Sequence, residues 1–298
     1  MRMRRYLAIL PFLFVVGLSP AARAALRVVT SIPDFGAIAG EIGGGHVEVT
    51  ALVKPTQDPH FLDAKPSLEL ALNRADLLLV AGMELEAGWL PALVAGARNA
   101  AIQRGGKGYL DCSTLIPPME VMAVDRAKGD IHPGGNPHYW IDPRNGLRLA
   151  QGITKKLGEI DPDHGADYAA GYARFAARLK DRMAKWQLRL APQRGTRVVA
   201  YHRSWIYFLD WAGFVAVGEL EPKPGIPPKA SHVAELITAV RGQNVKYLVQ
   251  EAFYPTQLSQ IFADKTGAKL KVLPTMVGAA GTHTYFDVIE RLVEELTS

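Results

Sequence analysis

The sequence predicts an α/β protein in which two lobes with parallel-type sheets are joined by one long backbone helix. In both halves of the chain, short apolar strands alternate with amphipathic helices, the order that is typical of a parallel sheet covered by helices. Residues 75–80 contain a continuous apolar run of the kind found in strands that are buried on both faces. Between the halves, apolar side chains recur every three or four residues over 167–190, which predicts a helix about 36 Å long.

The N-terminal half is expected to form four strands with their covering helices. The predicted strands are 26–31, 47–53, 75–80 and 108–110. The predicted helices are 32–42, 68–73, 83–95 and 147–157. Ser67 follows Pro66 at the start of the second helix, where it is expected to cap the free backbone N–H groups. Asp161-Pro162 is expected to end the last helix of this half.

The C-terminal half repeats the alternation. The predicted strands are 197–201, 214–220, 247–250 and 269–273. The predicted helices are 205–212, 232–241, 257–266 and 285–296. Together these elements predict an N-terminal lobe over 25–166, a linking helix over 167–190 and a C-terminal lobe over 191–298.

The first residues have the pattern of a secretory signal peptide. A basic start with Arg2, Arg4 and Arg5 precedes an apolar run over 6–18, and Ala22-Arg23-Ala24 supplies a small-x-small cleavage site. The sequence therefore predicts a signal peptide over 1–24 and a periplasmic mature chain. No cysteine lies near the cleavage site to accept a lipid.

Charge and cysteine content exclude several classes of protein. The formal net charge is +5, and four of the positive charges belong to arginines of the predicted signal peptide, so the mature chain is almost neutral. No basic stripe with interleaved aromatic residues is present, which argues against a nucleic-acid partner. Cys112 is the only cysteine, so neither an internal disulfide nor a thiolate metal cluster can form.

Three of the eight histidines stand out by their position. His60 and His138 directly follow prolines, in Asp58-Pro59-His60 and Asn136-Pro137-His138, and His202 follows a predicted strand. Proline stiffens the backbone around it, and ligands of open α/β sheets collect at the carboxyl ends of the strands. The three histidines are therefore predicted to meet in a metal site. The remaining four histidines outside the 125–135 loop are expected to be ordinary surface residues: His46, His164, His232 and His283.

The chain resembles a known family over essentially the whole mature sequence. The two proline-histidine motifs, with Ala75-Asp76 and Gly82-Met83-Glu84-Leu85-Glu86 between them, are similar to those of the metal-binding solute-binding proteins of ABC importers, the ZnuA-like and TroA-like family. The resemblance implies two α/β lobes, a rigid backbone helix and a metal ion in the cleft between the lobes. It implies that His60, His138 and His202 are ligands.

The fourth ligand of that family departs from the pattern here. An aspartate is expected in the loop after the last strand, and Thr275 stands in its place. We nominate Glu251, at the end of the strand over 247–250, as the replacement. The alternatives are that Glu251 accepts a hydrogen bond from a ligand imidazole, that Asp58 binds, or that water fills the position. His132 lies where zinc-type members often have a histidine-rich stretch, so a metal-collecting role for it is a further alternative.

Three neutral imidazoles favour Zn²⁺, whereas Mn²⁺ prefers more carboxylate oxygen. The sequence thus predicts a monomeric periplasmic protein that binds Zn²⁺ and delivers it to the membrane permease of an ABC importer, with no enzymatic activity. One alternative is capture of Mn²⁺ or Fe²⁺ by the same class of protein. The other is a zinc hydrolase, in which three histidines hold a water and Glu251 acts as the general base.

Overall fold

A computed structural model of the chain describes residues 24–121, 132–223 and 225–298. The predicted signal peptide and most of the polar loop over 125–135 lie outside the described residues, so those predictions are untested. Within the described ranges, no helix combines the length and the apolar character that crossing a membrane requires.

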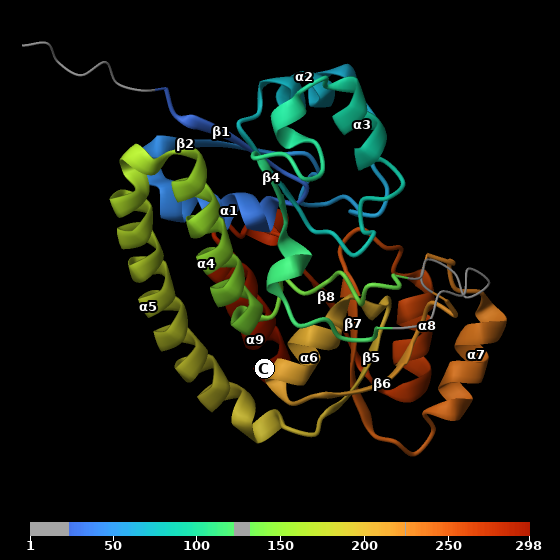
Figure 1. Ribbon diagram of the computed structural model, residues 1–298. Helices are drawn as coiled ribbons and strands as arrows, with labels where there is room; N and C mark the ends of the chain where they lie inside the picture. Colours follow the sequence, from blue (N-terminus) through green and yellow to red (C-terminus); the bar gives the residue numbers. More distant parts are fainter. Residues whose placement is uncertain (1–23, 122–131, 224) are drawn as a thin grey trace, which may run out of the picture.

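The first sheet contains four parallel strands in the order β2-β1-β3-β4 (Figure 1). The strands are β1 (Leu26–Thr30), β2 (Val47–Ala51), β3 (Leu77–Val80) and β4 (Tyr109–Asp111). Helices α1 (Pro33–Gly43), α2 (Pro66–Arg74), α3 (Leu90–Gly96) and α4 (Pro143–Ile160) accompany this sheet. All four residues of β3 are buried, as the continuous apolar run predicts.

The second sheet repeats this arrangement with the order β6-β5-β7-β8, again entirely parallel. The strands are β5 (Arg197–Ala200), β6 (Val215–Glu219), β7 (Val245–Glu251) and β8 (Lys269–Leu273). The helices are α6 (Ile206–Ala212), α7 (Ala230–Ala239), α8 (Gln257–Thr266) and α9 (Tyr285–Thr297). The predicted α/β class with two parallel sheets is confirmed.

A single long helix links the two sheets. Helix α5 (Gly165–Leu190) has 26 residues, which corresponds to about 39 Å, and it runs along one edge of the molecule (Figure 1). Its buried face includes Tyr168, Phe175 and Trp186. These aromatic side chains pack in the core, as their helical spacing predicts.

Helix α9 fastens α5 at the end nearest the second sheet. Glu290 of α9 accepts a hydrogen bond from Nε1 of Trp186 at 2.8 Å and pairs with Arg182 and Arg189. Partial burial acts to raise the pKa of Glu290, but the hydrogen bonds from Trp186 and Arg189 and the charges of the two arginines lower it. Because α9 also contacts α1, the closing helix touches elements of both halves. The division of the chain at residues 167 and 190 therefore stays a prediction.

Two local predictions in the N-terminal half were wrong. The helix expected over 83–95 begins only at Leu90, because Met83 and Glu84 have left-handed φ angles of 49° and 64°. The carboxylate of Glu86 instead accepts hydrogen bonds from the backbone N–H groups of Ala81 and Gly82, which stabilises a turn. Ser67 does not cap α2, since the N-cap residue is Lys65 and makes no side-chain capping bond.

Asp34 ties the first turn of α1 to a loop far along the chain. Its Oδ2 accepts a hydrogen bond of 3.3 Å from the backbone N–H of Val277, and its side chain is fully buried. Burial raises the pKa of Asp34 to about 8, and the backbone hydrogen bonds offset this only in part. In the unfolded chain, an aspartate titrates near its ordinary pKa of about 3.9.

This difference predicts a pH-dependent stability. Between about pH 4 and pH 8 the folded state binds more protons at Asp34 than the unfolded state does, so stability falls as the pH rises through that range. Asp34→Asn should reduce the difference in free energy of unfolding between pH 5 and pH 8 by at least about 1.4 kcal/mol, the value of one pKa unit. Urea denaturation of the metal-free protein measures it. Asp264→Asn, at an exposed position, is the control, and an equal effect of both substitutions would contradict the assignment.

Candidate metal centre

Three histidines from distant parts of the chain converge in the cleft between the two sheets. His60 lies in the loop between β2 and α2, His138 in the loop before α4, and His202 two residues after the end of β5. Their ring centroids are separated by 5.0 Å (His60–His138), 5.2 Å (His60–His202) and 5.0 Å (His138–His202). One potential ligand atom of each ring lies within 4.8 Å of those of the other two. All three side chains are buried.

The two proline-histidine motifs orient their rings in the same way. In the first, Oδ1 of Asp58 contacts Nδ1 of His60 at 2.7 Å and accepts a hydrogen bond from the His60 backbone N–H at 3.0 Å. In the second, Oδ1 of Asn136 makes the same pair of interactions with His138, at 2.9 and 3.0 Å. The residue before each proline is therefore the one that fixes the ring. This orienting role was not predicted, although the Asx-Pro-His sequence that both motifs share could have indicated it.

His202 is oriented by a residue from a different loop. Its Nδ1 lies 2.6 Å from Oε2 of Glu221, which follows β6 and is itself buried. An acceptor at Nδ1 favours the tautomer in which Nδ1 carries the proton and Nε2 presents its lone pair. Nε2 of His60 and of His202 are both buried, and neither has a hydrogen-bond partner among the described residues. Burial also holds the pKa of His138 well below its usual value, which keeps its imidazole neutral.

The arrangement fits a tetrahedral metal ion. Imidazoles bound to zinc by Zn–N bonds of about 2.0–2.1 Å in a tetrahedron have ring centroids about 5 Å apart. The three observed separations of 5.0, 5.2 and 5.0 Å have this value. Buried nitrogen lone pairs without a donor are costly, so an ion bound by the three rings would give the Nε2 atoms of His60 and His202 a partner.

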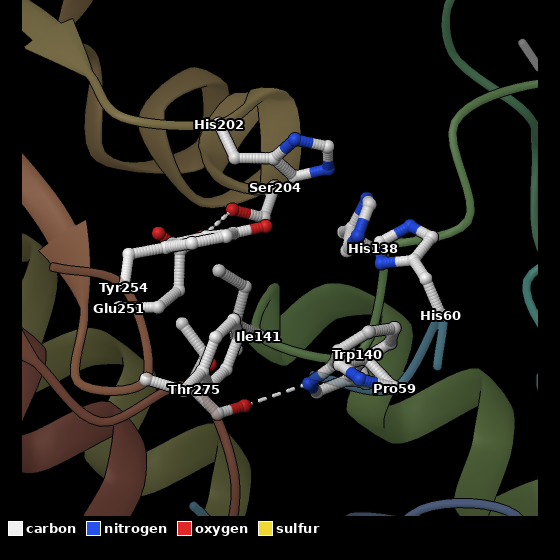
Figure 2. A pocket seen from close by; sticks show the side chains of 11 residues that line it. Pro59, His60, His138, Trp140, Ile141, His202, Ser204, Glu251, Tyr254 and Thr275 are labelled. Carbon is white, nitrogen blue, oxygen red and sulfur yellow. Dashed lines mark hydrogen bonds between the residues drawn. The ribbon is translucent and has the colours of Figure 1, made fainter. Parts of the chain in front are cut away.

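Glu251 lies in the same pocket but does not belong to the cluster of ligand atoms. In Figure 2 the histidines gather on one side of the pocket, and Glu251 lies across from His60. Its Oε1 accepts a hydrogen bond from the Ser204 hydroxyl, whereas Oε2 is buried and has no hydrogen-bond partner among the described residues. Burial raises the pKa of Glu251 well above its ordinary value. Its role as a ligand remains a prediction.

Asp58, the other side chain considered for the fourth ligand, and Thr275, which stands where an aspartate is expected, both make structural contacts. Oδ1 of Asp58 holds His60, and its Oδ2 accepts a hydrogen bond of 3.3 Å from the Tyr254 hydroxyl. Thr275 is buried in the pocket wall, where its backbone carbonyl accepts a hydrogen bond of 2.7 Å from Nε1 of Trp140 (Figure 2). Asp58 thus acts on the site through His60, while Thr275 connects the loop after β8 to the second proline-histidine motif.

The remaining histidines fall into two groups. His132 lies beside the cluster, with its ring centroid 5.6 Å from His60 and 6.4 Å from His138. The other four lie outside it: His46 and His164 stack on each other at 3.9 Å, His232 contacts the carbonyl of Glu219, and His283 is exposed.

Comparison with known proteins identifies the family. A family model described as zinc-uptake complex component A, periplasmic, matches residues 28–298. The chain belongs to this family. Its members are metal-binding substrate-binding proteins of ABC importers rather than enzymes, which leaves no support for the hydrolase alternative.

The named relatives differ in their metal. The chain is 25% identical to the manganese-binding lipoprotein MntA of Halalkalibacterium halodurans, over 92% of this chain and 88% of the relative. It is 29% identical to the high-affinity zinc uptake system protein ZnuA of Paracoccus denitrificans, over 65% of this chain and 66% of the relative. A crystal structure of ZnuA superimposes with a TM-score of 0.76 and 25% identity, covering 92% of this chain and 98% of that one.

The orienting role of Asp58 predicts a graded loss of metal affinity. Asp58→Ala should weaken Zn²⁺ binding by about 10- to 100-fold, because the His60 ring loses the acceptor that fixes its tautomer. Asp58→Asn should retain most of the affinity, since Asn136 makes the same interactions in the second motif. Competition with a chromophoric chelator measures the dissociation constants, and Asp63→Ala, exposed in the same loop, is the control. Unchanged binding in Asp58→Ala would refute the role.

Proposed function

We propose that this protein captures Zn²⁺ in the cleft between its lobes and delivers it, in the periplasm, to the permease of an ABC importer. The observation that carries the proposal is the convergence of three buried histidines, with one potential ligand atom of each ring within 4.8 Å of those of the other two. Neutral imidazole suits Zn²⁺ better than Mn²⁺. The family description supports zinc uptake and a periplasmic location.

The charges around the site support a divalent cargo. No carboxylate oxygen joins the three histidines in the cluster of ligand atoms within the described residues. Asp58 and Glu221 nevertheless place carboxylates directly behind two of the rings. Such outer partners increase the basicity of the imidazoles and balance the ion's charge. The ligands His60, His138 and His202 are therefore proposed to hold Zn²⁺, and Glu251 would reach it through Oε2, which has no hydrogen-bond partner among the described residues.

The proposal requires that the three histidines act together. A His60→Ala/His138→Ala double variant should lose Zn²⁺ affinity by more than the about 100-fold expected for loss of an outer-shell partner, because two of the three donors are gone. Isothermal titration of the metal-free proteins measures this. A His232→Ala/His283→Ala double variant, which removes two histidines outside the cluster, should bind as the natural protein does. Undiminished Zn²⁺ binding by the His60→Ala/His138→Ala variant would refute the proposal.

The metal preference needs a direct measurement with Mn²⁺ alone. Almost any site prefers Zn²⁺ to Mn²⁺ in competition, so displacement experiments cannot distinguish a zinc protein from a manganese protein. We expect Mn²⁺ to bind weakly, with a dissociation constant in the high micromolar range or above, because three imidazoles without a carboxylate suit it poorly. Electron paramagnetic resonance of free Mn²⁺ during titration measures it. Binding at submicromolar concentration would favour the manganese alternative that the MntA relative suggests.

A further inference from the structure

The side chain of Asp58 connects His60 to the second half of the chain, the half that carries the second sheet. Its Oδ1 contacts Nδ1 of His60 at 2.7 Å, and its Oδ2 accepts a hydrogen bond of 3.3 Å from the Tyr254 hydroxyl. Tyr254 lies three residues after β7, and its backbone carbonyl accepts a bond of 2.8 Å from the amide of the buried Gln250. Its ring stacks on that of Tyr201, with the centroids 4.3 Å apart. The hydroxyl that reaches Asp58 is therefore held by residues next to the second sheet.

The side chain of Asn136 makes the equivalent connection for His138. Its Oδ1 contacts Nδ1 of His138 at 2.9 Å, and its Nδ2 donates a hydrogen bond of 2.9 Å to the backbone carbonyl of Arg203. The backbone carbonyl of Asn136 also accepts a bond of 2.9 Å from the hydroxyl of Tyr207, in α6. The guanidinium of Arg203 pairs with Glu120, to which Nδ2 of Asn136 also donates at 3.3 Å. In both motifs, the end of the Asx side chain that does not hold the histidine is thus bonded to the second half.

The ring of His202 is oriented without a connection between the halves. Its partner Glu221 follows β6, which is the neighbour of β5 in the second sheet. The backbone N–H of Glu221 donates to the carbonyl of Tyr201, the residue before His202, at 3.0 Å. His202 is therefore fixed within one half of the chain, whereas His60 and His138 are fixed by side chains that also contact the opposite half.

The bonds across the cleft restrict the rotation of the two Asx side chains. A side chain that is bonded at both ends cannot turn without breaking a bond, and a buried polar atom that loses its partner carries a cost in free energy. An imidazole without a fixed acceptor at Nδ1 exchanges between its tautomers, of which only one presents a lone pair at Nε2. The apparent affinity for an ion then falls in proportion to the fraction of molecules in the competent form.

We propose that the Asx residues of the two motifs couple the apposition of the two halves to the orientation of the histidines that follow them. Tyr254 is then a positioning residue for His60, on which it acts through Asp58. The proposal rests on the proposed function, since the rings concerned are those proposed to hold Zn²⁺. It gives the protein a route to release its cargo: a small separation of the halves would free two of the three rings together and leave only His202 oriented.

The hydroxyl of Tyr254 tests the first connection. In metal-free protein labelled with ¹⁵N-histidine, long-range proton–nitrogen correlation spectra report the tautomer of each ring. We expect Tyr254→Phe to change His60 from one tautomer to a mixture and to leave His202 unchanged. Zn²⁺ affinity should fall about 2- to 10-fold, the value of one hydrogen bond, with no further fall when Tyr254→Phe is added to Asp58→Ala. Tyr201→Phe, which removes the hydroxyl of the ring stacked on Tyr254, is the control and should change neither readout.

A substitution of Asn136 tests the second connection. In Asn136→Asp, a carboxylate can still hold His138 in the way that Asp58 holds its own histidine. It cannot donate to the carbonyl of Arg203, however, and it is repelled by Glu120. We therefore expect a mixture of tautomers at His138 and a loss of Zn²⁺ affinity of at least about 10-fold, measured by competition with a chromophoric chelator.

The outcomes separate this inference from the proposed function. Single tautomers at His60 in Tyr254→Phe and at His138 in Asn136→Asp would overturn the coupling, even if stability or affinity falls. Equal disturbance of His202 would also overturn it, because it would indicate a general loosening of the site. The same holds for an equal loss of affinity from Tyr254→Phe with and without Asp58. The tautomers are measured without metal, so failure of the natural protein to bind Zn²⁺ would refute the proposed function and leave the coupling to be judged by the spectra.

Discussion

The hydrogen bonds to the Nδ1 atoms of the three clustered histidines determine what the cleft can do. Without an acceptor at Nδ1, a buried imidazole can rotate or adopt the other tautomer, and its lone pair no longer points at a fixed place. Here Asp58, Asn136 and Glu221 each hold one ring. The contacts that fix the rings offset the free-energy cost of burying Nε2 atoms without hydrogen-bond partners. The site is thus prepared before any ion arrives.

The two sheets keep these rings in place because several side chains connect the lobes close to the site. The amide of Asn136 donates to the carbonyl of Arg203, the neighbour of His202, at 2.9 Å. Nε1 of Trp140 donates to the carbonyl of Thr275, and the hydroxyl of Tyr285 donates to the carbonyl of Trp140 at 2.7 Å. Farther away, α5 and α9 are fastened through Glu290. A relative movement of the lobes would therefore have to break contacts that also position the ligands.

The choice of metal depends on details that members of the family do not share. Relatives named for zinc and for manganese are about equally similar to this chain. The distinction must come from the donor set, because Zn²⁺ and Mn²⁺ differ in their preference for nitrogen and oxygen ligands. In this chain, the loop after β8 contributes Thr275, which is engaged through its backbone, and no carboxylate oxygen of the described residues joins the three histidines in the cluster of ligand atoms. Both features reduce the oxygen character of the site.

The sequence by itself determined the α/β class, the long helix and the three histidines, because these features depend on periodicity and on residue types at strand ends. Strand β8 and helix α8 have the predicted bounds. The turn at Met83 and Glu84 was missed. It is stabilised by a hydrogen bond from the Ala81 backbone N–H to the carboxylate of Glu86, five residues along the chain, and this bond outweighs local helix propensity. Only the tertiary structure could reveal the pairing of His202 with Glu221, since the two residues lie on different loops. The same holds for the separation of Glu251 from the ligand atoms and the approach of His132, because both depend on how distant loops are brought together in the folded chain.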